Sequence, residues 1–303
     1  MKIEDGPFFY QILLRHGFRF FTGVPDSLLK DFCAVVDENA NSQSHIIASN
    51  EGAAIALAAG HYLASENPAL VYMQNSGLGN AVNPLTSLAD SSVYSIPMLL
   101  MIGWRGEPGY SDELQHLKQG QITCPMLVTL GIPYEILPIN LLDATACIEK
   151  AKFFMEKNAS PYALVVRKDT FSRYLKKNPP SDHYIMSREQ AVAAILAEIP
   201  NDAIVVVSTG MISREVFEVR EQASHLHQDF LTVGSMGHAN QIALGVAEAK
   251  PNRQVYCIDG DGAFIMHMGS VATIGARAPK NFKHIILNNE AHDSVGGQPT
   301  AAT

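Results

Sequence analysis

The feature that most constrains the fold is a strand–helix–strand unit between residues 255 and 290. Residues 255–258 read as an apolar strand that runs into Gly260-Asp261-Gly262, and residues 284–287 read as a second strand that runs into Asn289. The stretch between them, 263–277, has helical composition. This order predicts two parallel strands whose carboxyl ends lie at one edge of a sheet, where open α/β sheets bind their ligands.

The same alternation of strand and helix runs through the whole chain, which predicts an α/β protein whose parallel sheets are covered by helices. The expected strands are residues 18–22, 45–48, 69–73, 98–102, 162–167, 203–207 and 230–233, and the expected helices include 28–36, 50–60 and 238–249. Ser27 has the side chain of a good cap for the helix that follows it. A length of 303 residues suggests about two such domains.

Composition excludes several classes of protein. The net charge of −8 argues against a general nucleic-acid binder or a protein of anionic membrane surfaces, so an anionic ligand must be held by local groups. Four cysteines without paired or metal-type spacing favour a reduced, cytoplasmic protein. The amino terminus lacks a signal-peptide pattern, and the longest apolar run, near 96–104, is too short to span a membrane.

The glycine-rich turns differ in what they predict. Ser76-Gly-Leu-Gly-Asn80 begins like a dinucleotide fingerprint, but Val82 stands where the third glycine belongs, which favours a simple strand-to-helix turn. At 260–262 a carboxylate lies beside glycines, with the amide of Asn289 expected nearby. Such oxygen ligands suit Mg²⁺ that holds a diphosphate.

Three further elements agree with a diphosphate site. Gly234-Ser-Met-Gly237 lies one strand earlier, Ser208-Thr-Gly210 lies two strands earlier, and Glu51 begins a helix in the other half. With these elements together, essentially the whole chain resembles the thiamine-diphosphate-dependent decarboxylases. The resemblance implies two parallel-sheet, three-layer domains of the thiamine diphosphate-binding fold, with thiamine diphosphate and Mg²⁺ as cofactors.

The resemblance also implies a domain order. Residues 1–170 are expected to bind the aminopyrimidine, 171–186 to form a polar linker with a Pro-Pro pair, and 187–303 to bind the diphosphate. This order resembles the small 2-oxo acid decarboxylases that act on phosphonopyruvate or sulfopyruvate. Related second domains continue for further strands, so we expect this one to be truncated at its carboxyl end and less stable than in a longer homologue.

The roles of the cofactor residues are likewise implied by the resemblance. Asp261, Asn289 and the carbonyl of Ala291 are expected to ligate Mg²⁺. The backbone groups that contact the diphosphate are expected to come from Gly260, Gly262, Ala263, Ser208, Thr209 and Gly210. Met236 is expected to wedge beneath the cofactor, and the Gly234 carbonyl to accept from its 4′-amino group.

Glu51 resembles the glutamate that hydrogen-bonds N1′ of the aminopyrimidine. Burial among Ala53, Ala54, Ala56 and Ala58 is expected to raise its pKa and to suit it to proton relay near neutrality. Without the resemblance, a glutamate at a helix amino terminus is explained by the helix dipole alone.

Segments around 103–109, 112–120 and 292–300 resemble phosphonopyruvate decarboxylases, which implies the reaction phosphonopyruvate → phosphonoacetaldehyde + CO₂ in phosphonate biosynthesis. Arg105 is the candidate for the distal anionic group. His116 and His292 are candidate proton donors or anion contacts, or else packing or solvated histidines. Ser27 faces the substrate or caps its helix, and Gln119 shapes a closing loop or an ordinary turn.

Sulfopyruvate decarboxylation is the nearest alternative, and a noncatalytic interaction protein on the same fold is the alternative from another class. A carboligase is less favoured because no central domain is visible. The resemblance also implies a shared site, with Glu51 from one chain and Asp261 from another. The protein is therefore expected to self-associate as a dimer or a tetramer.

Overall fold

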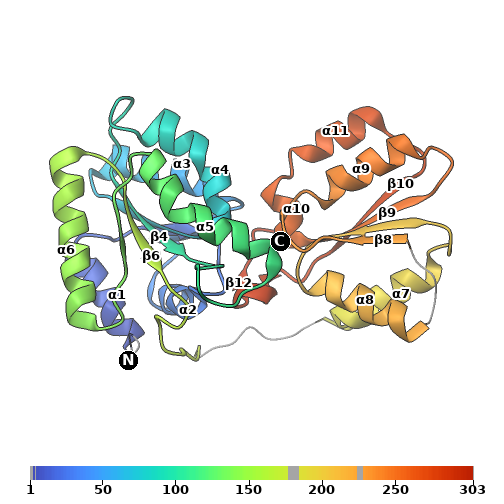
Figure 1. The fold of residues 1–303 in the computed structure, drawn as a ribbon, viewed down its shortest axis with the longest axis horizontal. Coiled ribbons are helices and arrows are strands. Elements are labelled where there is room, and N and C mark those ends of the chain that lie inside the picture. The colour runs from blue at the N-terminus through green and yellow to red at the C-terminus, as the bar shows by residue number, and fades with distance from the viewer. Residues whose placement is uncertain (1–2, 4, 177–183, 224–227, 303) are drawn as a thin grey trace. The chain divides into compact units, whose positions relative to one another are not determined.

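The computed structural model describes residues 3, 5–176, 184–223 and 228–302. The chain divides into two compact units, one made of residues 1–179 with 295–298 and the other of 180–294 with 299–303 (Figure 1). Residues 177–183 of the expected linker lie outside the described residues. The boundaries expected at 170 and 187 stay a prediction.

The first unit is built on a six-stranded parallel sheet. Its strands lie in the order β2-β1-β3-β4-β6-β5, and each pairing is parallel. They are β1 (Phe21–Gly23), β2 (His45–Ile47), β3 (Ala69–Gln74), β4 (Met98–Gly103), β5 (Tyr134–Ile136) and β6 (Tyr162–Val166). The central strands β3 and β4 are apolar except for Gln74 at the end of β3, as a sheet covered on both faces requires.

Helices cover both faces of this sheet (Figure 1). One face packs against α1 (Gly6–Arg15), α2 (Lys30–Asn39) and α6 (Leu141–Asn158), and the other against α3 (Glu51–Ser65), α4 (Leu78–Pro84) and α5 (Leu114–Thr129). Alternate residues of β3 enter the two cores: Tyr72 points to the first and Val71 to the second. The turn η1 (Asn75–Gly77) joins β3 to α4, and η2 (Leu85–Ala89) follows α4.

The second unit contains a four-stranded parallel sheet in the order β10-β9-β7-β8. Its strands are β7 (Ile204–Val207), β8 (Gln228–Leu231), β9 (Val255–Gly260) and β10 (Phe282–Leu287). Helices α7 (Arg188–Glu198) and α8 (Met211–Ala223) cover one face, and α9 (Ala239–Ala249) covers the other. After β9 come α10 (Asp261–Met266) and α11 (Ser270–Arg277), which packs on α9.

The chain then ends in short elements: β11 (Ala291–His292), η3 (Asp293–Val295) and β12 (Gln298–Pro299). No helix within the described ranges is both long enough and apolar enough to cross a membrane.

Several predicted boundaries are wrong. The strand expected at 18–22 begins only at Phe21, and the strand expected at 230–233 ends at Leu231. The helix expected across 263–277 is two helices, because the chain turns at His267–Gly269. Strand β5 and helices α5 and α6 were not predicted. A signal was available for α6, because Asn140 caps its amino terminus by accepting from the Asp143 N–H at 2.9 Å.

Ser27 does not cap α2, which corrects one of its two expected roles. The helix begins at Lys30, and Leu29 in the cap position makes no side-chain cap bond. The side chain of the preceding residue binds the backbone of this turn instead, because Asp26 Oδ2 accepts from the Leu28 N–H at 3.0 Å. The Ser27 hydroxyl instead accepts a hydrogen bond from Arg105 at 2.8 Å.

Candidate functional site

The carboxyl edge of the four-stranded sheet gathers the turns that the sequence predicts for the diphosphate. Gly260 pairs with Leu287, so Asp261 and Asn289 follow adjacent strands, as their spacing indicated. Residues 208–210 follow β7 and residues 234–237 follow β8. Given the strand order, all four turns share one edge of the sheet.

Asp261 is the buried carboxylate of this edge. It is the first residue of α10, and only 4% of its surface is exposed. Its Oδ2 accepts a hydrogen bond from the Thr300 hydroxyl at 2.6 Å. Oδ1 has no hydrogen-bond partner among the described residues, which leaves an anionic oxygen for a cation. Thr300 was not predicted, because no local pattern connects it to a residue thirty-nine positions earlier.

Asn289 lies in a tight turn. Its Oδ1 accepts from the Ala291 N–H at 3.2 Å, and Glu290 adopts a left-handed φ of 56°. Asn288 stabilises the turn by accepting from the Glu290 N–H at 2.9 Å and donating to the Ala302 carbonyl at 2.9 Å. Within the described part of the chain no hydrogen bond joins Asn289 to Asp261, so their joint metal binding stays a prediction.

Gly262 forms a cradle that a side chain would fill. A Cβ there would lie 3.0 Å from Nδ1 of His292 and 3.4 Å from Cε of Met236. The predicted wedge residue and the predicted histidine are thus both brought to the glycine turn. Close approach of a ligand to this backbone requires glycine.

His292 is buried at the same place, and its Nε2 has no hydrogen-bond partner among the described residues. Burial lowers the pKa of His292, and the nearby Asp261 carboxylate partly opposes that shift. A buried, unpartnered ring nitrogen beside a carboxylate is a costly arrangement for a fold alone. It fits a site that takes a polar ligand.

Asp259 was not predicted and links strand β9 to the edge strand β10. It is fully buried; Oδ1 accepts from the Gly260 N–H at 3.0 Å, and Oδ2 lies 3.2 Å from Nε2 of His284. This cross-strand bond lies two residues before Asp261. The available signal was an acidic residue at the end of an otherwise apolar run, which a fully buried strand tolerates only with partners.

Glu51 begins α3 in the first unit, after Asn50, whose side chain caps the helix by accepting from the Ala53 N–H at 2.8 Å. Only 5% of Glu51 is exposed, and burial raises its pKa, against a smaller lowering by the hydrogen bond from Asn80 at 2.8 Å. The predicted direction of the pKa shift is therefore confirmed.

The residues that bury Glu51 differ from the expected ones. Ala56 is exposed, so the alanines of α3 are only part of the environment. Gly77 lies so close that a Cβ there would be 2.3 Å from Oε1 of Glu51. The turn that resembled a dinucleotide fingerprint thus supplies Gly77 and Asn80 to the glutamate, and as predicted it joins a strand to a helix.

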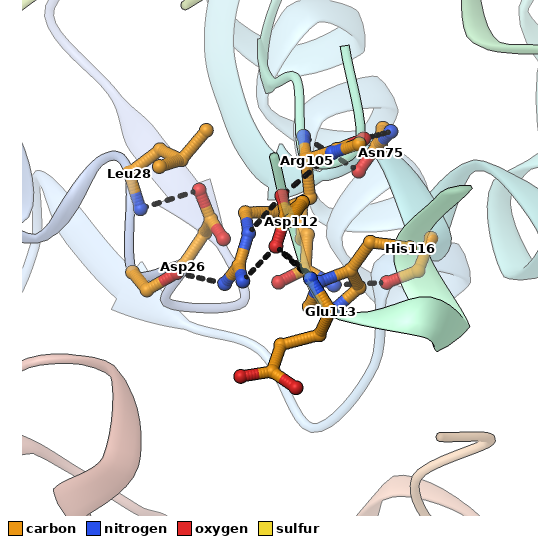
Figure 2. Close-up of polar contacts among 11 residues, drawn as sticks. Asp26, Leu28, Asn75, Arg105, Asp112, Glu113 and His116 are labelled. Carbon is orange, nitrogen blue, oxygen red and sulfur yellow. Dashed lines mark hydrogen bonds and ion pairs between the residues drawn. The ribbon is translucent and has the colours of Figure 1, made fainter. Parts of the chain in front are cut away.

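The predicted substrate residues Arg105 and His116 meet at Asp112 (Figure 2), and Ser27 joins this network through Arg105. Arg105 donates to both carboxylate oxygens of Asp112, from Nε at 2.9 Å and from Nη2 at 2.5 Å. Its Nη1 donates to Ser27 Oγ at 2.8 Å. Nδ1 of His116 lies 3.0 Å from Oδ1 of Asp112.

Gln119 stands apart from this network. It lies in the middle of α5, which corrects the expectation of a loop or turn. Its backbone carbonyl accepts from the Thr123 hydroxyl at 2.6 Å.

Asn75 connects the arginine network to Glu51. Its side chain donates to the Arg105 carbonyl at 2.8 Å and accepts from the Arg105 N–H at 3.2 Å (Figure 2). Gly77, two residues further in the same turn, packs on Glu51. The turn η1 therefore holds the arginine and the glutamate in one local structure.

Asp26 is a further buried carboxyl in this region that the sequence did not single out. Burial raises its pKa to about 6, although the Leu28 N–H and the Arg105 charge lower it. Its Oδ1 has no hydrogen-bond partner among the described residues.

Comparisons with known proteins agree with this arrangement. The thiamine pyrophosphate enzyme N-terminal TPP binding domain matches residues 6–123, and the corresponding C-terminal TPP binding domain matches residues 206–303. A phosphonopyruvate decarboxylase of Streptomyces viridochromogenes is 34% identical over 298 residues, covering 93% of this chain and 72% of the relative. The chain therefore belongs to the thiamine pyrophosphate enzymes, in the family of thiamine-diphosphate-dependent decarboxylases.

Sulfopyruvate decarboxylases are also relatives. That of Methanosarcina acetivorans is 27% identical over 314 residues, covering 96% of this chain and 77% of the relative. In Methanococcus maripaludis two separate sulfopyruvate decarboxylase subunits match. The alpha subunit is 38% identical over 41% of this chain and 72% of its own length. The beta subunit is 40% identical over 37% of this chain and 58% of its own length.

The residues present fit the cofactor of this family, thiamine diphosphate with Mg²⁺. Asp261 offers a buried anionic oxygen, Gly262 leaves its backbone open between Met236 and His292, and Glu51 is a buried carboxyl. A buried carboxyl group costs free energy unless it is paired, and a carboxylate oxygen is a ligand that Mg²⁺ prefers.

Proposed function

We propose that the protein decarboxylates phosphonopyruvate to phosphonoacetaldehyde and CO₂, a step of phosphonate biosynthesis. The observation that carries the proposal is the position of Arg105. Its backbone is bonded to Asn75 of η1, the turn that also packs on Glu51, and only three of its five side-chain N–H bonds are engaged by side chains of the described residues. A guanidinium with two unengaged N–H bonds can donate hydrogen bonds to the oxygens of a phosphonate. Similarity to the Streptomyces enzyme along most of both chains supports the same substrate.

The cofactor residues are assigned by the same proposal. Asp261 and Asn289 ligate Mg²⁺ together with the carbonyl of Ala291, whose N–H already orients Asn289. The backbone of 208–210 and 260–263 would hold the diphosphate. Met236, which lies against Gly262, would support the cofactor, and the Gly234 carbonyl would accept from its amino group. When bound, thiamine diphosphate supplies the carbon nucleophile and the electron sink for loss of CO₂.

The chain itself holds and moves protons. Burial raises the pKa of the Glu51 carboxyl, which suits this group to exchange a proton with the ring nitrogen that the bound cofactor would present to it. Nδ1 of His116 lies against the Asp112 carboxylate, so the proton on Nδ1 is fixed and Nε2 is left for the substrate. His292 presents an unpartnered Nε2 beside Asp261 and is the second candidate proton donor.

The substrate is tested by comparing phosphonopyruvate with sulfopyruvate. We expect kcat/KM for phosphonopyruvate to exceed that for sulfopyruvate by about tenfold or more. A phosphonate carries one negative charge more than a sulfonate, and a hydrogen bond to a charged group contributes about 1.5–3 kcal/mol. Release of CO₂ by purified protein with thiamine diphosphate and Mg²⁺ measures both. A preference for sulfopyruvate would favour the alternative that the Methanosarcina relative represents. No cofactor-dependent CO₂ release from either acid would reject both.

We further propose that the protein self-associates as a dimer or a tetramer with Glu51 and Asp261 of each site on different chains. The match to separate alpha and beta subunits in Methanococcus maripaludis supports a division of one site between two chains. Mixing a Glu51→Gln protein with an Asp261→Ala protein is expected to restore up to about a quarter of the activity, as random pairing into mixed dimers would give one intact site in every two. Mixed dimers without activity would reject the shared site.

A further inference from the structure

The carboxylate of Asp112 is the centre of the network in Figure 2. It accepts from Arg105 Nε and Nη2, from the backbone N–H groups of Gly106 at 2.7 Å and Glu113 at 2.8 Å, and lies 3.0 Å from Nδ1 of His116. These donors come from the loop after β4 and from the beginning of α5. A carboxylate with so many donors is fixed in position as well as charged.

The loop around Asp112 packs too tightly to shift easily. Gly106 adopts a φ of 69°, and a Cβ there would lie 2.0 Å from the His116 carbonyl. Trp104 Nε1 donates to the Gly120 carbonyl at 2.8 Å. The Arg105 guanidinium also holds the pKa of Asp112 well below its usual range, so the carboxylate stays charged.

We propose that Asp112 is the positioning residue of the substrate site, because it orients both Arg105 and His116 and leaves two Arg105 N–H bonds and His116 Nε2 for the distal acid group. This inference rests on the proposed function and deepens it. Asp112 itself does not touch the substrate. Its effect passes through Arg105, which it holds from one side while Ser27 accepts from Nη1.

Electrostatics and positioning predict opposite effects of removing this carboxylate. Asp112 neutralises Arg105, so its loss would by charge alone improve the binding of an anionic substrate. If Asp112 acts by positioning, its loss weakens binding, because a guanidinium without its anchor loses orientation and ordering it again costs side-chain entropy. The sign of the change in KM therefore separates the two.

The test is the substitution Asp112→Asn in the full chain with thiamine diphosphate and Mg²⁺. We expect KM for phosphonopyruvate to rise about tenfold, while cofactor affinity stays at the wild-type value. Glu113→Gln is the matched control, since Glu113 is the next residue and its charge also favours the charged form of Arg105. In that variant KM is expected to stay the same or fall. An unchanged or lower KM in Asp112→Asn would overturn the proposal.

A double substitution shows whether Asp112 acts through Arg105. In an Arg105→Lys background, adding Asp112→Asn is expected to raise KM little further, because lysine lacks the fork that Asp112 holds. Equal effects in both backgrounds would overturn the proposal. If Asp112→Asn does not fold, Asp112→Glu keeps the charge but displaces the fork, and KM is expected to rise; a wild-type KM would overturn the proposal.

The outcome is separable from that of the proposed substrate. If the wild-type protein prefers sulfopyruvate, the substrate assignment fails, yet the same variants measured with sulfopyruvate still report on Asp112. The proposal then stands or falls on the same two results, the sign of the KM change and its dependence on Arg105.

Discussion

Substituting Glu51 by glutamine is expected to lower kcat by roughly 10²- to 10⁴-fold, the range that general acid–base residues contribute. Glutamine fills the same space and can still accept from Asn80, so the surroundings of residue 51 are preserved. It cannot take up or release the proton at that position. Steady-state CO₂ release, with thiamine diphosphate binding measured in parallel, checks this result. If the variant fails to fold or to bind the cofactor, the lost activity does not report on proton transfer by Glu51.

The same substitution is expected to raise thermal stability, and the gain depends on pH. Burial raises the pKa of Glu51, so the folded state holds this proton more tightly than the unfolded state. The folded protein therefore loses stability as the pH rises from the unfolded pKa toward the folded one. Glutamine has no such dependence, so the Tm advantage of Glu51→Gln should be larger at pH 8 than at pH 4. A constant Tm difference would contradict the buried, perturbed carboxyl.

Gly77 offers an independent way to disturb Glu51 without changing it. An alanine Cβ at this position would lie 2.3 Å from Oε1, so the carboxylate must move. Gly79→Ala is the matched control, since Gly79 lies two residues further and a Cβ there meets nothing within 4 Å. If Glu51 acts where the structure places it, Gly77→Ala reduces activity and Gly79→Ala does not.

The sequence predicts this part of the molecule well where the signal is local. The strand–turn–helix pattern at 255–263 and the polar end of β10 placed Asp261 and Asn289 on adjacent strands, and the family resemblance gave Glu51 its role. The placement of Asp261 and Asn289 succeeds because parallel strands direct their carboxyl ends to one edge whatever the details of packing. The role that the resemblance implies for Glu51 stays a prediction. The family is confirmed by both matching domains.

The contacts that fix the site depend on long-range packing and were not predictable in the same way. Thr300 reaches Asp261 only after the chain returns from β11, and Asp112 reaches Arg105 only because the loop after β4 folds back through a left-handed glycine. Ser27 was expected to cap a helix because serine usually does so. The Asp26 carboxylate instead accepts from the Leu28 N–H in that turn, and the Ser27 hydroxyl accepts from Arg105.

Substituting Asp261 by asparagine is expected to weaken activation by Mg²⁺ on the order of 10²-fold or more, since an amide oxygen replaces an anionic ligand of a hard cation. Asparagine retains an acceptor for the Thr300 hydroxyl, so the fold should be little disturbed. Titrating CO₂ release with Mg²⁺ at saturating thiamine diphosphate measures the change. An unaltered Mg²⁺ dependence would show that Asp261 is not a metal ligand.

Thr300→Val separates the ligand from the residue that orients it. Valine has nearly the shape of threonine but cannot donate to Oδ2, which leaves Asp261 charged and less well held. We expect the Mg²⁺ concentration needed for half-maximal activation to rise about tenfold, as for other partners that orient a metal ligand. We also expect a loss of about 1 kcal/mol in the free energy of unfolding. Because the carboxylate is still present, the defect in Thr300→Val should be overcome at high Mg²⁺, whereas that in Asp261→Asn should persist over most of the same range. A Thr300→Val defect that excess Mg²⁺ does not relieve would mean that this hydroxyl supports the fold of the β9–α10 turn instead of the orientation of the ligand.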